Sequence, residues 1–182
     1  PEPTRRRIVE SVRPFASLAT QTTWCRSEQL HITLAFIGDV APAFLPHLRQ
    51  TLDEVCAGVT ALPCRVAHYG YFGSSRQPKV IWAGVEPAFE LTLLHEQLWR
   101  ALRKLGYQEK GTSFHPHVTL ARCKGGAINK ALLAEMERNE DDVFGEWLVD
   151  KVTLFASKPS PRGSIYRALN TSPLRTAPLG SS

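Results

Sequence analysis

The stretch HITLA at His31–Ala35 recurs as HVTLA at His117–Ala121. The two copies start 86 residues apart in a chain of 182 residues, which is close to half of its length. Both copies are rich in apolar and β-branched residues, which favour a strand. Side chains two residues apart on a strand point to the same face of a sheet. Each copy therefore presents one imidazole and one hydroxyl in the same direction.

A repeat of this kind predicts two halves related by a pseudo-twofold axis, with His31 and His117 facing each other across a central groove. Two imidazoles on opposite sides of one phosphorus can act as a general acid and a general base, because the unperturbed pKa of histidine is about 6.5. The hydroxyls of Thr33 and Thr119 can hydrogen-bond the non-bridging phosphate oxygens, and the planar guanidinium of Arg122 suits the same target. The scheme requires no metal and no other cofactor.

The composition is that of an ordinary globular domain, with 43% hydrophobic and 21% charged residues. No run of eighteen apolar residues is present, and no apolar stretch follows the basic N-terminal residues, so we expect neither a membrane span nor a secretory signal. A net charge of +5 favours an anionic partner. The four cysteines lack metal-ligand spacing, which indicates reduced thiols in a cytoplasmic protein. We expect a monomer.

The spacing of apolar residues predicts alternating helices and strand hairpins. The helices are expected at residues 4–18, 43–58, 88–105 and 129–138, and the strands at 29–37, 63–72, 79–85, 116–123, 146–156 and 164–169. Pro14 is expected to kink or end the first helix. This order favours an α+β fold, a single domain over residues 1–170 with two interleaved lobes. Two antiparallel sheets would face the groove, helices would lie outside, and residues 171–182 would form a loose tail.

The paired motifs resemble the signature of the two-histidine phosphoesterase superfamily, and more closely that of its bacterial and archaeal RNA 2',3'-cyclic phosphodiesterase branch, also called 2'-5' RNA ligases. The resemblance covers roughly residues 4–170. Its supporting segments are Leu30–Gly38, Pro78–Val85, Phe114–Arg122, Val152–Ser157 and Gly163–Tyr166. Two motifs in the correct order make it specific.

This resemblance implies a bilobal α+β fold and the opening of a terminal 2',3'-cyclic phosphate on RNA to a 2'-phosphate. By the same resemblance, His31 is the general acid for the departing 3'-oxygen and His117 is the general base that activates water. Arg122 matches a phosphate ligand of the family. Ligation of 2'-5' ends is the reverse reaction.

Two features depart from the family pattern. Relatives open with a short apolar strand before the first helix, whereas the printed sequence begins at that helix. Strict alternation also puts Arg122 on the strand face opposite His117 and Thr119. A β-bulge or the end of the strand must therefore turn Arg122 inward if it is to bind phosphate.

Two other functions stay open at this point. The same chemistry could act on a small cyclic nucleotide or on ADP-ribose cyclic phosphate. Alternatively, the chain could be an RNA-end-binding module without turnover, although binding alone does not need paired imidazoles.

Several aromatic residues are candidates for substrate contacts. Phe114 is expected to bind substrate, and His115 is expected in a loop near the mouth of the groove. Phe36, Tyr69 and Phe72 could stack a base, but core packing is the favoured interpretation for these three. The remaining histidines, His47, His68 and His95, are expected on the surface or on helices.

Overall fold

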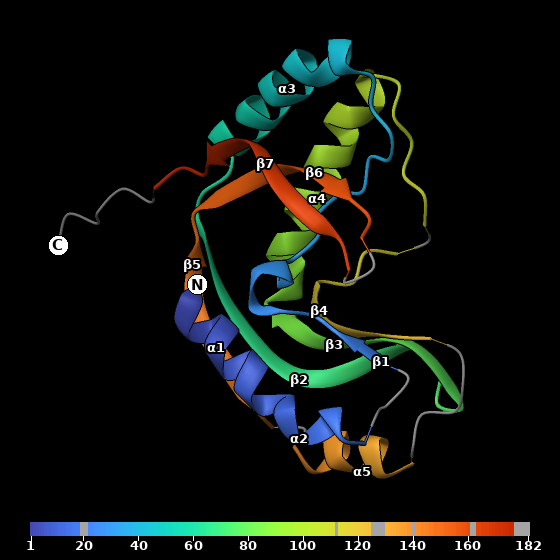
Figure 1. Cartoon of the computed structure of the whole chain (residues 1–182). Coiled ribbons are helices and arrows are strands. Elements are labelled where there is room, and N and C mark those ends of the chain that lie inside the picture. The colour runs from blue at the N-terminus through green and yellow to red at the C-terminus, as the bar shows by residue number, and fades with distance from the viewer. Residues whose placement is uncertain (19–21, 112, 125–129, 140, 161–162, 177–182) are drawn as a thin grey trace, which may run out of the picture.

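The structure is a computed structural model that describes all residues except 19–21, 112, 125–129, 140, 161–162 and 177–182. It confirms the α+β class, with antiparallel sheets and helices packed against them (Figure 1). The helices are α1 (Glu2–Ser11), α2 (Arg13–Ala16), α3 (Leu45–Ala57), α4 (Ala88–Lys104) and α5 (Lys130–Arg138), with 3-10 turns η1 (Ser27–Gln29) and η2 (Pro42–Phe44). The strands are β1 (Thr22–Trp24), β2 (Leu62–Ser74), β3 (Gln77–Glu86), β4 (His117–Cys123), β5 (Val143–Val149), β6 (Lys151–Lys158) and β7 (Ile165–Pro173).

The larger sheet has the strand order β1-β4-β3-β2-β5, and every neighbouring pair in it is antiparallel. Strands β2 and β3 form a hairpin in which Ser74 pairs with Gln77. The connection is therefore two residues long, shorter than the expected loop over residues 73–78. Gly73 lies at the register shift beside this turn with φ of 106°, which a residue without Cβ adopts without strain.

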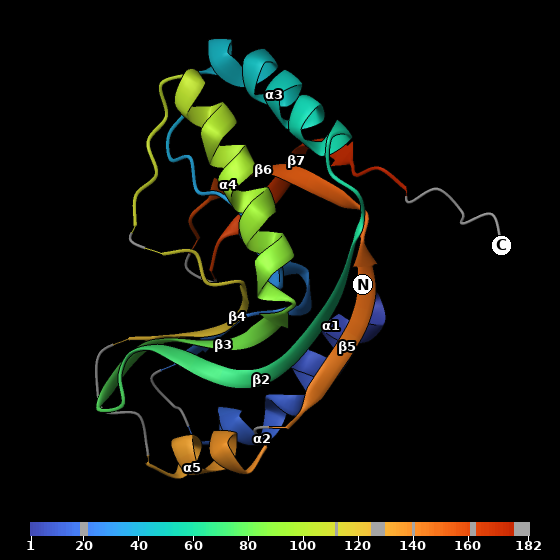
Figure 2. The same ribbon diagram turned by 180° about the vertical axis from the view of Figure 1, so that it is seen from behind.

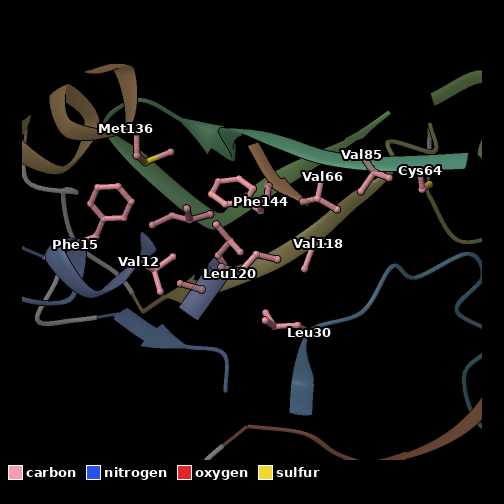
Figure 3. Packing of buried hydrophobic residues seen from close by; sticks show 14 of the residues in the cluster. Val12, Phe15, Leu30, Cys64, Val66, Val85, Val118, Leu120, Met136 and Phe144 are labelled. Carbon is pink, nitrogen blue, oxygen red and sulfur yellow. The ribbon is translucent and has the colours of Figure 1, made fainter. Parts of the chain in front are cut away.

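The main core lies between the larger sheet and the helices α1, α2 and α5, which cover one of its faces (Figures 1 and 3). Ile8, Val12 and Phe15 recur at helical spacing and are at most 8% exposed. They meet alternate residues of the strands, among which Val118 and Leu120 of β4 point into the same core (Figure 3). The opposite face of β4 is thereby left for polar side chains.

The second part of the fold contains α3, α4 and the two-stranded sheet β6-β7, and Figure 2 shows α3 beside α4. Helix α4, expected from the sequence at residues 88–105, carries a stripe of leucines along one side. Leu91 of this stripe packs in the main core, Leu94 and Leu98 pack with α3 residues, and Leu102 packs in a third cluster with Leu48. One helix thus joins all three clusters and fixes the two sheets relative to each other.

The strand expected over residues 146–156 is two strands. Strand β5 ends at Val149, where it pairs with β2, and β6 begins at Lys151, where it pairs with β7. Between them, the Asp150 carbonyl accepts a hydrogen bond from the Leu174 N–H (2.7 Å), which turns the chain from one sheet to the other. Asp150 and Lys151 interrupt the apolar run at this point, but a charged pair by itself does not indicate that the strand changes its pairing partner.

The strand expected over residues 29–37 was also wrong. Only Ile32 pairs there, through an isolated antiparallel bridge to Val118. Side chains take backbone groups that a neighbouring strand would otherwise use. His95 Nδ1 lies 2.7 Å from the Leu34 carbonyl oxygen, and His31 Nδ1 lies 2.7 Å from the Gln29 carbonyl oxygen.

Two boundaries also differ from the prediction. The first helix breaks at Val12 into α1 and α2, and Pro14 lies in the first turn of α2, where a missing N–H costs little. At the other end, β7 continues to Pro173 and Leu174 is buried, so the chain is structured beyond residue 171. The rest of the expected tail, residues 177–182, lies outside the described residues.

Candidate active site

The two repeated motifs lie next to each other in space. Their central residues, Ile32 and Val118, form an antiparallel bridge. In an antiparallel register this bridge sets His31 opposite Thr119 and Thr33 opposite His117, and directly opposed Cβ atoms lie about 5 Å apart. Since Ile32 and Val118 both pack on the main core, the four motif side chains lie on the other side. We call the side that carries these two histidines and two threonines the motif face.

Both histidine rings are held in the same way. His31 Nδ1 lies 2.7 Å from the carbonyl oxygen of Gln29, and His117 Nδ1 lies 2.7 Å from that of His115. A carbonyl oxygen only accepts, so each Nδ1 is the donor. This arrangement leaves Nε2 of each ring as the atom that can take or give a proton.

Thr33 is already engaged with its own histidine. Its Oγ1 lies 3.0 Å from His31 Nε2, so the hydroxyl donates to this nitrogen when the ring is neutral. The hydroxyl and Nε2 are close enough to contact one oxyanion together.

The surroundings of His117 lower its pKa. Burial lowers its pKa from 6.5, and the positive charges of His115, His31 and Arg122 lower it further, while the hydrogen bond to the His115 carbonyl acts in the opposite direction. The net effect favours the neutral ring, which is the proton-accepting form. The same influences show that His31 and Arg122 lie near His117.

The strand that carries His117 contains a β-bulge of the kind that Arg122 needs. In the pairing of β3 with β4, Trp82 pairs with Thr119 while the next residue, Ile81, pairs with Ala121. Leu120 is therefore the extra residue, and Leu120 and Ala121 are both buried. Because two successive residues face the core, the alternation changes phase and Arg122 leaves the core side.

Phe114 is placed apart from the histidine pair. Its ring stacks on His95 of α4, with centroids 4.1 Å apart and planes 8° from parallel, and it packs on the main core. One ring face is therefore occupied by the protein itself. If Phe114 binds substrate, as predicted, the substrate must contact the ring face opposite His95.

His95 differs from the expectation of a surface or helix residue without partners. It lies on α4 but is 8% exposed, and its two nitrogens face the Leu34 carbonyl (2.7 Å) and the Glu109 carboxylate (2.9 Å). It therefore holds the chain just after the first motif against α4. His95 and Leu34 are far apart in the sequence, so no local sequence pattern predicted this contact.

The other aromatic candidates divide into three cases. Tyr69 packs edge-on against Phe144 in the core, as favoured. Phe36 is 69% exposed, so the favoured core packing was wrong for it. Phe72 is partly buried and lies edge-on to the His117 ring, with centroids 4.9 Å apart at 87°.

Sequence reasoning assigned no role to Tyr166, whose ring contacts His31. The centroids lie 4.8 Å apart at 65°, and Tyr166 comes from β7 of the smaller sheet. Each motif histidine thus has an aromatic ring edge-on to it, one from each sheet. The segment Gly163–Tyr166 was part of the family resemblance, which was the available signal for this residue.

The described residues contain no group of three or more potential metal ligands of the His, Cys, Asp and Glu types. A cavity of about 530 Å³ near Pro63, Arg65 and Trp147 includes none of the motif residues.

No helix within the described ranges is long and apolar enough to cross a membrane.

Comparisons with known proteins agree with this geometry. The family model described as the 2'-5' RNA ligase superfamily matches residues 1–159. A curated relative from Archaeoglobus fulgidus, named RNA 2',3'-cyclic phosphodiesterase, is 33% identical over 167 residues, which cover 89% of this chain and 91% of the relative. One of the same name from Aquifex aeolicus is 30% identical, over 87% of this chain and 85% of the relative.

Solved structures give the same fold. The crystal structure of TT0787 from Thermus thermophilus is similar with a TM-score of 0.78 at 29% identity, and the match covers 97% of this chain and 94% of that one. Escherichia coli LigT complexed with 3'-AMP gives a TM-score of 0.74 at 22% identity, over 96% of this chain and 92% of that chain.

Proposed function

We propose, because the chain belongs to the 2'-5' RNA ligase superfamily and its two histidine motifs are bridged face to face, that this protein hydrolyses 2',3'-cyclic phosphate ends of RNA. Relatives at about 30% identity over most of the chain bear the corresponding name. The observation that carries the proposal is the Ile32–Val118 bridge, since it brings both imidazoles to one face. A protein that only binds RNA ends would not need that pairing.

In the proposed reaction, His117 is the general base. Its Nε2 takes a proton from water, and the water oxygen attacks phosphorus. The lowered pKa of His117 supports this assignment, because a base must be neutral when it acts. The bond from phosphorus to the 3'-oxygen breaks as His31 Nε2 donates a proton to that oxygen. The product is a 2'-phosphomonoester with a free 3'-hydroxyl.

The remaining polar groups would stabilise the charge that develops on the non-bridging oxygens. Thr33 and Thr119 can donate hydrogen bonds from the motif face, and Arg122 can contribute two N–H donors in a planar arrangement. The bulge at Leu120 supports this role for Arg122, since it frees the side chain from the core side of β4. Neither a metal nor a cofactor takes part in these steps.

The proposal includes a monomer that acts in the cytoplasm. All four cysteines, Cys25, Cys56, Cys64 and Cys123, are free thiols, as expected in a reducing compartment. Burial raises the pKa of both Cys56 and Cys64 to about 11, so these thiols stay protonated and unreactive.

The test is hydrolysis of an oligoribonucleotide that ends in a 2',3'-cyclic phosphate, with a chelator present. The expected product is the 2'-phosphate, identified by mass and by phosphatase treatment. A parallel assay with a mononucleoside 2',3'-cyclic phosphate separates an RNA-specific enzyme from one for small cyclic nucleotides. Product formation that stops after one turnover would instead indicate an RNA-end-binding module, and loss of activity in chelator would reject the metal-independent mechanism.

A further inference from the structure

One face of the smaller sheet is directed at the active site and has no role in the mechanism above. In the pairing of β6 with β7, Ser157 lies opposite Tyr166 and Phe155 lies opposite Ala168. Residues two apart share a face, so these four side chains lie on the same side of the sheet. The contact between Tyr166 and His31 shows that this side is turned toward the motif face. We call it the Tyr166 face.

The other side of the same sheet is already covered. Val152 and Leu154 alternate with Phe155 along β6 and pack on the clusters that contain residues of α3 and α4. Among the residues that the structure describes, no hydrophobic cluster covers the Tyr166 face. Phe155 is 45% exposed, although its ring also contacts that of Tyr166 (centroids 5.9 Å apart, at 68°). A rigid aromatic ring that is open to solvent is a surface on which a nucleobase can stack.

The proposed reaction decides where the nucleoside must lie. In an in-line displacement, the attacking water and the departing oxygen are on opposite sides of phosphorus. The water is beside His117, so the 3'-oxygen is beside His31. That oxygen belongs to the ribose of the terminal nucleotide, and its base is attached to the same ribose. The nucleoside therefore extends from the His31 end of the site.

The aromatic residues at the His117 end contact one another and the backbone of β2. Trp82 lies on the backbone of Gly70, where an added Cβ would come within 2.2 Å of the indole ring. Its free ring surface is met by His115 (centroids 4.7 Å apart) and Phe72 (5.4 Å). These rings therefore contact one another beside His117. On the side of the reacting ribose, the Tyr166 face presents the ring of Phe155, which is 45% exposed.

We propose that the Tyr166 face of β6-β7 binds the nucleoside of the reacting RNA end, with the ribose beside Tyr166 and the base stacked on Phe155. This inference rests on the proposed function, because the direction of in-line attack follows from the acid and base roles of the two histidines. It makes Phe155 a binding residue for any nucleobase, since every base has an aromatic face.

The experiment compares Phe155→Ala with Phe44→Ala, because Phe44 of η2 is a phenylalanine of matching exposure (48%) in another part of the fold. Two substrates are used, adenosine 2',3'-cyclic phosphate and methyl riboside 2',3'-cyclic phosphate, which lacks the base. Phe155→Ala should raise KM for the adenosine substrate by about fivefold to a hundredfold, the range expected for loss of one base–aromatic stack. Its KM for the base-free substrate, and both KM values of Phe44→Ala, should stay within twofold of the wild type.

A second variant and a binding measurement complete the test. Phe155→Trp should keep KM for the adenosine substrate near the wild-type value, because it keeps an aromatic surface. An equal rise of KM for both substrates in Phe155→Ala, or no rise for either, would overturn the inference. If the wild type hydrolyses neither small substrate, the oligoribonucleotide assay described above decides the proposed function separately. Calorimetric titration with adenosine 2'-monophosphate then measures binding to the Tyr166 face without turnover. Equal affinities of the wild type and Phe155→Ala would overturn the inference that the base stacks on Phe155.

Discussion

The two halves of the active site hold their histidines alike but support them differently. Each imidazole donates Nδ1–H to a carbonyl two residues earlier over 2.7 Å, and each meets an aromatic ring edge-on. His117, however, begins a strand that pairs with β3 along its length, whereas the His31 segment has one bridge at Ile32. The same local geometry is thus obtained once from a sheet and once from separate tertiary contacts.

This difference matches the two proposed roles. The sheet buries His117 and lowers its pKa, which suits a proton acceptor. The His31 segment depends on contacts from other elements, namely His95 of α4 at Leu34 and Tyr166 of β7 at the imidazole. The acid is therefore positioned by the second part of the fold, and the base by the first.

The largest expected effect tests whether both halves are needed. His31→Ala and His117→Ala should each lower kcat by about a hundredfold to ten-thousandfold, the usual contribution of a general acid or base. KM should change much less, and circular dichroism should show the same folded state. Steady-state hydrolysis of a cyclic-phosphate RNA end measures this, with His47→Ala on α3 as an exposed control. If either variant keeps more than a tenth of the wild-type kcat, the two-imidazole mechanism is rejected.

The next effect concerns the bulge that distinguishes the second half. Arg122→Ala should lower kcat/KM by about tenfold to a hundredfold, the cost of losing a charged hydrogen-bond donor to the phosphate. Arg122→Lys should recover only part of this loss, because an ammonium keeps the charge but not the planar pair of donors. Arg49→Ala on α3 is the control for loss of an exposed arginine. Full activity of Arg122→Ala would exclude phosphate binding by this residue.

The sequence predicted the local structure, namely which side chains share a face and where the helices lie. It did not predict which segments pair with each other. The repeat placed His and Thr on one face, because alternation along an extended chain is a local property. The helices followed from apolar spacing, as the stripe of α4 shows. The split at Asp150 and the single bridge at Ile32 depend on which segment pairs with which, and local preference for extended structure does not encode the partner.

The contacts that position His31 are also between segments that are far apart in the sequence, so the sequence did not predict them. Tyr166 meets His31 across the two sheets, at a separation in sequence that no short pattern covers. The sequence indicated that a β-bulge or the strand end must turn Arg122 away from the core side. The strand pairing in the structure shows that the bulged residue is Leu120. Side chains that act through tertiary contacts are thus the part of the site that one sequence leaves open.

A smaller effect tests the difference in support directly. Tyr166→Leu should lower kcat by about threefold to tenfold, since an aromatic pair contributes about 0.5–1.5 kcal/mol and the His31 segment is joined to the sheet by one bridge only. Phe72→Leu should change kcat by less than about threefold on the same scale, because β4 holds His117 in place. Tyr166→Phe should restore kcat if the ring rather than the hydroxyl positions His31. The comparison fails if Phe72→Leu has the larger effect on kcat.

The smallest effect is a shift in the pH profile at the His117 half. The profile of kcat/KM should be bell-shaped, and its acidic limb should lie below pH 6.5, because the lowered pKa keeps His117 neutral to lower pH. His115→Gln keeps the backbone carbonyl that holds His117 Nδ1 but removes one of the positive charges that lower its pKa. The pKa of His117 should then rise, so the acidic limb should move up by less than about one pH unit, as expected for a partly solvated charge pair. The plateau of kcat/KM should stay within about threefold of the wild type, because a half-solvated neighbouring charge contributes little once His117 is neutral. An acidic limb that moves to lower pH, or does not move, would show that His115 does not act on His117 through its charge.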